Sequence, residues 1–157
     1  MSTKVSNNLI GITGEYLVCG ELGKRNVLGL LSPKNTPLYD IVATNPLGTH
    51  TVHIQVKTMA STNKTGWKLG KTIEHLQENP LLFMVLVRLK GLEEPPDFYI
   101  YRYDDLSRSV TSKFAKYMSI LKRNGEKRKK TDMRCHNFNE FTEEDHLALN
   151  NWSLLGF

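Results

Sequence analysis

The chain has little cysteine and no long apolar segment. Its 157 residues include two cysteines, Cys19 and Cys135, which is too few for a disulfide framework and favours a reducing compartment. The longest apolar run, "PLLFMVLV", is far shorter than the ~20 residues that cross a bilayer. The opening "MSTKVSNNLIGITGEY" lacks the continuous apolar core of a signal peptide. We therefore expect a soluble, cytoplasmic protein that does not associate with membranes.

Internal repeats and low-complexity linkers are also missing, so we expect one domain spanning residues 1–157. Hydrophobic residues make up 39% and charged residues 24% of the chain, an ordinary composition that argues against gross disorder. The net charge is +5 and the isoelectric point is about 9.2. This balance suits a polyanionic partner, although many basic proteins have none.

The pattern of apolar residues predicts an α/β domain with a central mixed sheet of about four strands flanked by helices. The segment "LLFMVLVRL" is apolar on both faces and predicts a strand in the interior of the sheet. Thr142, three residues before Asp145, resembles a capping box and predicts a helix near the C-terminus. The other expected helices cover 8–24, 71–79 and 106–121, and the other expected strands cover 38–43, 51–57 and 98–103.

The first expected helix carries a carboxylate in an apolar setting. Asn7 or Asn8 can cap this helix, and its apolar residues are scattered almost all round, which predicts a mostly buried helix. Glu15 falls on an arc that it shares with Val18 and Leu22. A buried carboxylate needs a partner, because an unpaired buried charge is very costly.

The segment "YDIVATNPLGTHTVHIQVKT", residues 39–58, predicts a hairpin with three notable polar residues. A turn centred on Leu47 and Gly48 pairs residues whose numbers sum to 95, which places Asp40 opposite Gln55 at a Cβ separation of about 4.5–5.5 Å. Lys57 follows on the same strand face as Gln55. The spacing therefore permits one cluster of a carboxylate, an amide oxygen and an ammonium group.

Such a cluster suits the hydrolysis of a phosphodiester bond. Mg²⁺ prefers hard oxygen ligands, keeps several waters and lowers the pKa of a bound water. A neighbouring lysine can stabilise developing negative charge or position the attacking water. The same residues also occur on the solvent-facing side of ordinary hairpins, so the spacing by itself does not separate a catalytic site from a plain hairpin.

The segments "GITGEYLVCGEL", "YDIVA" and "HIQVKT" resemble the PD-(D/E)xK nuclease superfamily, which includes type II restriction enzymes and archaeal Holliday junction resolvases. In that family a helix carries a Glu, the next strand carries the Asp, and a further strand carries (D/E)-x-K. Glu15, Asp40 and Lys57 match this order over residues 9–58. The resemblance implies a restriction-endonuclease-like core and a Mg²⁺-dependent endonuclease acting on duplex or branched DNA, with Mn²⁺ as a substitute.

The sequence departs from the family pattern at two places. Leu38 and Tyr39 stand where the family has proline, and Gln55 replaces the acidic residue of (D/E)-x-K, as in some homing endonucleases and recombination nucleases. By resemblance, Asp40 is the main metal ligand, and Gln55 and the backbone carbonyl of Val56 complete the ligand set. Glu15 supplies the missing carboxylate, directly or through water. Lys57 orients the water and stabilises the transition state.

Several other residues are candidates for contacting DNA. The segment Lys122–Arg134 holds seven Lys and Arg residues and predicts an exposed basic loop, in which Lys127, Arg128, Lys129 and Lys130 can contact phosphates. His53 shares the strand face of Gln55 and can contact substrate, or it is a plain exposed strand residue. Trp67 can stack on a base or anchor its own loop.

Two further hypotheses belong to other classes. One is a nucleic-acid-binding module on the same fold that has lost cleavage, with Gln55 as the trace of that loss. The other is a structural or interaction protein that does not bind nucleic acid. For the nuclease we expect a homodimer or a higher homo-oligomer, because cutting both strands needs two active sites or two successive nicks.

Overall fold

A computed structural model of the chain describes residues 5–157. Residues 1–4, which open the N-terminal segment that we expect not to be a signal peptide, lie outside the described residues. Among the described residues, no helix has the length and apolar character needed to cross a membrane. The elements in chain order are α1 (Asn7–Lys24), β1 (Leu28–Leu31), β2 (Ile41–Thr44), β3 (Thr51–Met59), β4 (Gly66–Lys68), the 3₁₀ helix η1 (Lys71–Glu74), β5 (Leu82–Arg88), β6 (Asp97–Arg102), α2 (Tyr103–Ser119), β7 (Cys135–Asn137), η2 (Phe138–Glu140), α3 (Glu143–Leu147) and η3 (Trp152–Leu155).

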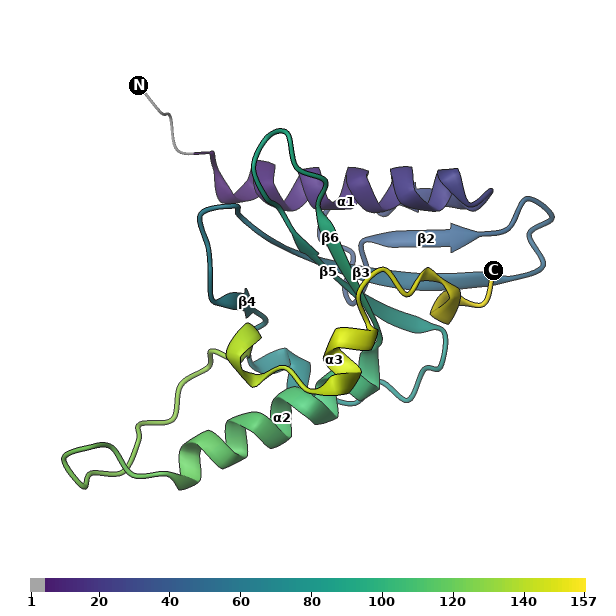
Figure 1. Cartoon of the computed structure of the whole chain (residues 1–157). Helices are drawn as coiled ribbons and strands as arrows, with labels where there is room; N and C mark the ends of the chain where they lie inside the picture. The colour runs from purple at the N-terminus through teal and green to yellow at the C-terminus, as the bar shows by residue number, and fades with distance from the viewer. Residues whose placement is uncertain (1–4) are drawn as a thin grey trace.

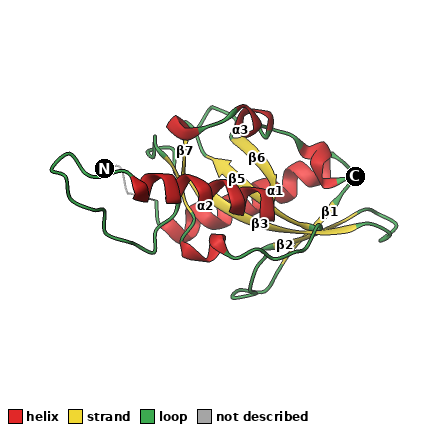
Figure 2. Cartoon of the chain, turned by 90° about the horizontal axis from the view of Figure 1, so that it is seen from below, coloured by secondary structure: helices red, strands yellow, loops and turns green. Residues whose placement is uncertain are grey.

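The α/β prediction is confirmed, with a mixed sheet of five strands in the order β1-β2-β3-β5-β6 (Figures 1 and 2). β3 and β5 run parallel, and the other neighbouring strands are antiparallel. A separate ribbon pairs β4 with β7. The expectation of about four strands missed β1, an edge strand of four residues whose side chains are mostly exposed and so give no clear alternating pattern.

The two long helices cover opposite faces of the sheet, as Figure 1 shows with α1 above and α2 below. Val18 and Leu22 of α1 pack with Ile54 and Val56 of β3 in one core cluster. On the other face Leu106 of α2 packs in a second cluster that contains the alternate residues of β5. Six of the seven residues of β5 are buried, so the prediction of a doubly covered strand is confirmed.

Helix α1 forms close to the expected bounds but is not mostly buried. Its cap is Ser6, whose hydroxyl accepts a 3.2 Å hydrogen bond from the N–H of Leu9, and not Asn7 or Asn8. Leu9 and Tyr16 are 55% and 63% exposed. The helix rests on one face of the sheet, so only one of its sides is covered and its scattered apolar residues cannot all be buried.

Two other predicted helices are shorter than expected. The segment 71–79 forms only the four-residue η1, because the carboxylate of Asp104 in α2 accepts hydrogen bonds from the N–H groups of Gln77 and Glu78 and holds that backbone out of a helix. The capping box of Thr142 and Asp145 is confirmed, but its helix α3 has five residues. The small, polar and basic residues of 59–70 predict a loop, but this segment contains the short strand β4.

Candidate active site

The hairpin register is confirmed over the paired residues of β2 and β3. Ile41 lies opposite Ile54 and Val42 opposite His53, so the numbers of paired residues sum to 95. The ladder ends there, so Asp40 lies just before β2, and its expected pairing with Gln55 falls outside the paired residues. Its own N–H donates a 2.9 Å hydrogen bond to the carbonyl of Ile54.

The carboxylate of Asp40 extends the sheet where β2 has not yet begun. Its Oδ2 accepts a 2.7 Å hydrogen bond from the backbone N–H of Val56. The side chain of Asp40 therefore accepts from Val56 the hydrogen bond that a backbone carbonyl would accept if β2 continued. Because the N–H and C=O of one strand residue point to the same side, the carbonyl of Val56 also faces the side of β3 on which Asp40 lies.

Helix α1 approaches β3 most closely at the residue that precedes Glu15. Gly14 is buried, and a Cβ atom at this position would lie 2.9 Å from Cβ of Thr58 and would overlap its hydroxyl. Only glycine permits this approach without a shift of the helix. The contact fixes the height of α1 above the end of β3, and so it fixes where Glu15 lies relative to Asp40.

The charges of two other candidate residues influence the ionisation of Glu15. Burial raises the pKa of Glu15, the nearby carboxylate of Asp40 raises this pKa further, and the ammonium of Lys57 lowers it. Charges influence one another in this way only over short distances, because water and salt screen distant pairs. Asp40 and Lys57 therefore both act on the charge of Glu15, which the family resemblance places in the same site.

An open pocket of about 480 Å³ lies beside the two carboxylates. Glu15 and Asp40 line it together with the start of α1 and the loop between β1 and β2. The lining from that loop includes Lys34, a basic side chain near the acidic pair. The pocket therefore offers two carboxylates and a cation to a ligand that enters from solvent. The full lining is Asn7, Asn8, Gly11, Ile12, Glu15, Ser32, Pro33, Lys34, Asn35, Thr36 and Asp40.

Gln55 and Lys57 start from the face of β3 opposite to α1. In the parallel ladder Gln55 is paired with Met84 and Lys57 with Leu86, and both partners belong to the cluster on the side of α2. Lys57 is half-buried near the end of the strand, and its charge still acts on Glu15. Gln55 is also half-buried, does not line the pocket of Glu15 and Asp40, and makes no side-chain hydrogen bond among residues 5–157.

The donor set fits a hard divalent cation with few protein ligands. Within residues 5–157 there is no group of three or more His, Cys, Asp or Glu side chains arranged to hold a metal ion. Mg²⁺ does not need one, since it is commonly held by one or two carboxylates with waters and substrate phosphate as its other ligands. Asp40 opposes the ionisation of Glu15, and a cation bound beside the two carboxylates would relieve this opposition.

Trp67 anchors its own loop and is not available to stack on a base. It is 2% exposed, and its indole Nε1 donates a 2.9 Å hydrogen bond to the carbonyl of Val87. Its ring also contacts Tyr99 and Phe138 in an aromatic cluster. The large apolar side chain completes the core on the α2 side, and this is why the DNA-contact hypothesis for Trp67 is wrong.

His53 is not a plain exposed strand residue either. Its ring centroid lies 4.6 Å from that of Tyr39, and its Nδ1 is buried without a hydrogen-bond partner among the described residues. The residue as a whole is half-buried.

The segment 120–134 contains no helix or strand and projects beyond the end of α2 (Figures 1 and 2). Lys127, Lys129 and Lys130 are exposed, as a phosphate-binding loop requires. Arg128 is partly committed to the fold, because its Nε donates to the carbonyl of Ile120 and its Nη1 donates to the hydroxyl of Tyr117. Arg128 is therefore a weaker candidate for a phosphate contact than the three lysines.

Arg134, the last residue of the basic segment, is fully buried. It pairs with Glu74 and donates hydrogen bonds to the carbonyls of Thr131 and Met133. Its guanidinium lies 3.5 Å from the ring centroid of Phe114 in α2. The expectation of a wholly exposed basic loop is therefore wrong at its last residue, which fastens the loop to the body of the domain.

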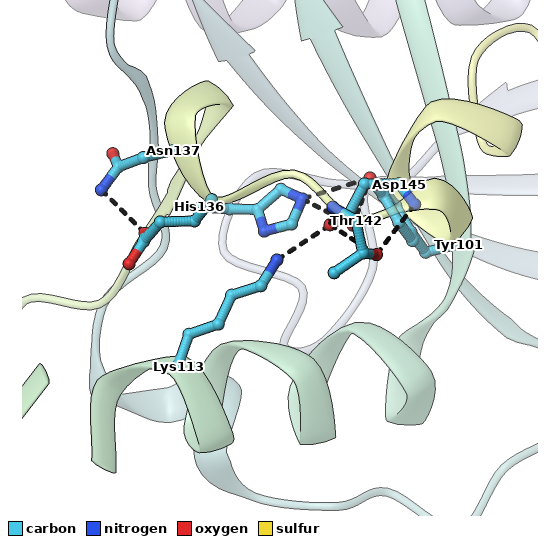
Figure 3. A network of polar contacts seen from close by, with 7 residues as sticks. Tyr101, Lys113, His136, Asn137, Thr142 and Asp145 are labelled. Carbon is cyan, nitrogen blue, oxygen red and sulfur yellow. Dashed lines mark hydrogen bonds and ion pairs between the residues drawn. The ribbon is translucent and has the colours of Figure 1, made fainter. Parts of the chain in front are cut away.

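A buried polar network joins β6, α2, β7 and α3, as Figure 3 shows. Asp145 accepts a 2.8 Å hydrogen bond from Lys113 and lies 3.2 Å from both Nε2 of His136 and the hydroxyl of Tyr101. Burial acts to raise the pKa of Asp145, but the hydrogen bonds from His136, Lys113 and Thr142 outweigh it and hold this pKa well below its usual range.

One signal of this network was visible in the sequence, namely the capping box that contains Asp145. Its partners His136 and Lys113 lie 9 and 32 residues earlier in the chain and show no motif. Each partner is buried or nearly so, since Lys113 exposes 16% of its side chain and His136 none. The network therefore serves to hold α2 against the C-terminal segment, and nothing places it at the pocket of Glu15 and Asp40.

Comparison of the chain with protein-family models, with curated proteins and with solved structures finds no match. The case for a function therefore stands on the geometry of the chain itself.

Proposed function

We propose that the protein is a metal-dependent endonuclease that hydrolyses phosphodiester bonds of DNA. The observation that carries this proposal is the convergence of Glu15 from α1, Asp40 from the start of β2 and Lys57 from β3 at one end of the sheet. The three residues come from separate elements, yet Asp40 and Lys57 both act on the charge of Glu15. Two carboxylates that line an open pocket, with a lysine whose charge acts on one of them, form a set suited to phosphodiester hydrolysis.

Each residue has a distinct role in the proposed site. Asp40 is the main metal ligand, and its hydrogen bond from Val56 holds one carboxylate oxygen in place and leaves the other free. Glu15 ligates directly or through water, and the carbonyl of Val56 lies on the same side of β3 as Asp40. A bound Mg²⁺ or Mn²⁺ would supply charge neutralisation of the phosphate and a more acidic water. Lys57 orients that water and stabilises the negative charge that develops on the phosphate.

Gln55 is the least supported member of the proposed set. Its amide oxygen carries no charge, and its strand face is that of α2. A second candidate function follows from this observation, namely a DNA-binding module on the same fold that no longer cleaves. The neutral amide of Gln55, at the position where the nuclease family has an acidic residue, favours this alternative.

The proposed substrate is duplex or branched DNA, and the proposed assembly is a homodimer or a higher homo-oligomer. The net charge of +5 and the exposed Lys127, Lys129 and Lys130 support a polyanionic partner. The restriction-endonuclease-like identity of the fold is part of the same proposal. It is supported by the order of helix, hairpin and parallel strand that carries Glu15, Asp40 and Lys57.

A plasmid nicking assay with Mg²⁺ or Mn²⁺ tests the proposal. We expect the wild-type protein to nick supercoiled plasmid, and we expect Asp40→Ala or Lys57→Ala to lower the rate by about 10²-fold or more, as is typical when a main ligand or a transition-state charge is lost. Asp105→Ala is the matched control, because Asp105 is an exposed carboxylate of α2 that only pairs with Arg108. Nicking by Asp40→Ala at the wild-type rate would overturn the assignment of this site.

A further inference from the structure

A second pocket, here called the α2 pocket, lies on the opposite side of the sheet from the candidate active site. It has a volume of about 290 Å³ and is enclosed by α2, by the return of the basic loop and by the η2 turn. Phe114 and Tyr117 contribute its aromatic wall, Met133 its apolar rim, and Asn137 and Glu140 its polar edge. The volume is at the lower end for ligand sites, which suits one small ring system.

The aromatic wall is stacked with guanidinium groups. Phe114 and Tyr117 lie with ring centroids 6.4 Å apart and an angle of 29° between the planes. Arg134 lies over Phe114 at 3.5 Å, and Arg128 lies over Tyr117 at 4.1 Å. Tyr117 is nevertheless 48% exposed, so much of its surface is open to a ligand. Aromatic rings interleaved with arginines are a surface on which nucleic-acid bases stack.

The pocket is held in shape before any ligand arrives. The fully buried Arg134 donates hydrogen bonds to the carbonyls of Thr131 and Met133, the two residues of the basic loop that line the pocket. On the other side Lys113 is fixed by its ion pair with the buried Asp145, as Figure 3 shows. Because the side chains of a rigid pocket are already ordered, ligand binding costs little side-chain conformational entropy.

The surroundings of the pocket select the class of ligand. Lys127, Lys129 and Lys130 are exposed in the same loop whose return forms the pocket wall. Nδ2 of Asn137 donates to Glu140 at 3.2 Å, so the edge of the pocket presents a carboxylate and an amide to the rim of a ring. The aromatic wall suits a flat ring, the amide and carboxylate suit polar groups on the edge of that ring, and the lysines suit an attached anion. A nucleotide combines these three chemical groups.

We propose that the α2 pocket binds one unpaired base of a DNA substrate, stacked against Tyr117, while the lysines of the basic loop contact the adjoining phosphates. A base within a duplex is stacked on its neighbours and cannot enter a pocket, so the pocket selects a nucleotide that is unpaired or extruded. This inference rests on the DNA-binding part of the proposed function, and it makes the preferred substrate a duplex that carries an unpaired nucleotide.

Binding of a fluorescent oligonucleotide tests the inference. The probe is a DNA duplex with a single unpaired 2-aminopurine, compared with the same duplex in which the 2-aminopurine is paired with thymine. The titrations use the Asp40→Ala variant of the full-length chain in the absence of metal, so that the DNA is not cleaved. We expect the unpaired probe to bind about 5- to 150-fold more tightly, which is the range that stacking of one base provides, and its fluorescence to be quenched on binding.

Variants of Tyr117 give the matched comparison. Tyr117→Ala should abolish the preference for the unpaired probe, whereas Tyr117→Phe keeps the ring and should retain it. Thermal melting of the three proteins shows whether the fold is intact, and Tyr117→Leu replaces the alanine variant if the latter melts early. Equal affinity of the parent protein for both probes, or an unchanged preference in Tyr117→Ala or Tyr117→Leu, overturns the inference.

The outcome is independent of the nuclease assignment. Plasmid nicking by the wild-type protein together with equal affinity for the two probes would leave the proposed function standing and reject the base pocket. A Tyr117-dependent preference without any nicking would support the pocket and reject the catalytic assignment.

Discussion

Gly14 of α1 lies directly against the side chain of Thr58 in β3. A Cβ atom at Gly14 would overlap the hydroxyl of Thr58 and lie 2.9 Å from its Cβ. This contact brings the helix down onto the end of the strand, one residue before Glu15 and one residue after Lys57. The geometry of the candidate site therefore depends on the absence of a single methyl group.

We expect Gly14→Ala to destabilise the protein and to weaken its metal binding. The added methyl group must push α1 away from β3, and overpacking of this kind costs roughly 1–3 kcal/mol in the free energy of unfolding. Gly20→Ala is the control, because Gly20 has no neighbour within 4 Å of a Cβ atom and alanine there should stabilise the helix by about 0.5–1 kcal/mol. Urea unfolding measures both changes, and equal effects of the two substitutions would contradict the close approach.

The raised pKa of Glu15 predicts a pH-dependent gain of stability for Glu15→Gln. Because the pKa of Glu15 is higher in the folded protein, ionisation of Glu15 destabilises the fold as pH rises through that pKa. In the absence of metal, Glu15→Gln should therefore be more stable than wild type at pH 7. The two proteins should become equal below the usual pKa of a glutamate, about 4.3.

Added metal should reverse this order. Mg²⁺ that binds the native state stabilises the wild-type protein more than the variant, which has lost one charged ligand. Urea unfolding between pH 4 and pH 8, with and without Mg²⁺, measures both effects. Glu93→Gln is the control at an exposed carboxylate. A variant that is less stable than wild type without metal at pH 7 would show that Glu15 does not lie in a cluster that opposes its charge.

For Gln55→Glu we expect tighter metal binding, with cleavage unchanged or reduced. A carboxylate oxygen is a better ligand for Mg²⁺ than an amide oxygen. The added charge also attracts Lys57 and raises the pKa of a nearby acid, so turnover need not follow affinity. Calorimetric titration of Mg²⁺ or Mn²⁺ into wild type and variant, with Asp40→Ala as the blank, gives the affinities. Because Gln55 starts on the face of α2, an unchanged affinity would place it outside the metal site.

Replacing Lys127, Lys129 and Lys130 by alanine should weaken binding to all duplex sequences alike. Each phosphate contact that is lost should lower the slope of log K against log salt by about 0.9. Arg128→Ala is the contrasting variant, since Arg128 donates hydrogen bonds to Ile120 and Tyr117. Its loss should make the loop less ordered and should change the salt dependence of binding less than the triple variant does. Fluorescence anisotropy at several salt concentrations gives the slope. An unchanged slope in the triple variant would mean that the loop is exposed to solvent and does not contact DNA phosphates.

The local parts of this fold were determined by the sequence alone. A candidate cap before residue 9 and the lack of proline predicted the helix of 8–24, and a run that is apolar on both faces predicted the buried strand around Val85, because these signals are local properties of the chain. The turn at Leu47 and Gly48 gave the register of β2 and β3, because a short turn leaves one pairing. The capping box gave the start of α3 for the same local reason.

The tertiary structure decided what depends on residues distant in the chain. Trp67 is a core residue because strands β4 and β5 meet in space, and Arg134 is buried because Glu74, 60 residues away, pairs with it. Asp40 turns to Val56 because the ladder ends at Ile41, and a register alone does not show where a ladder stops. Glu15 lines one pocket with Asp40 because α1 packs closely on β3 at Gly14. A sequence pattern names the residues that suit a site, but packing between elements sets their distances, and charges act on one another only over those distances.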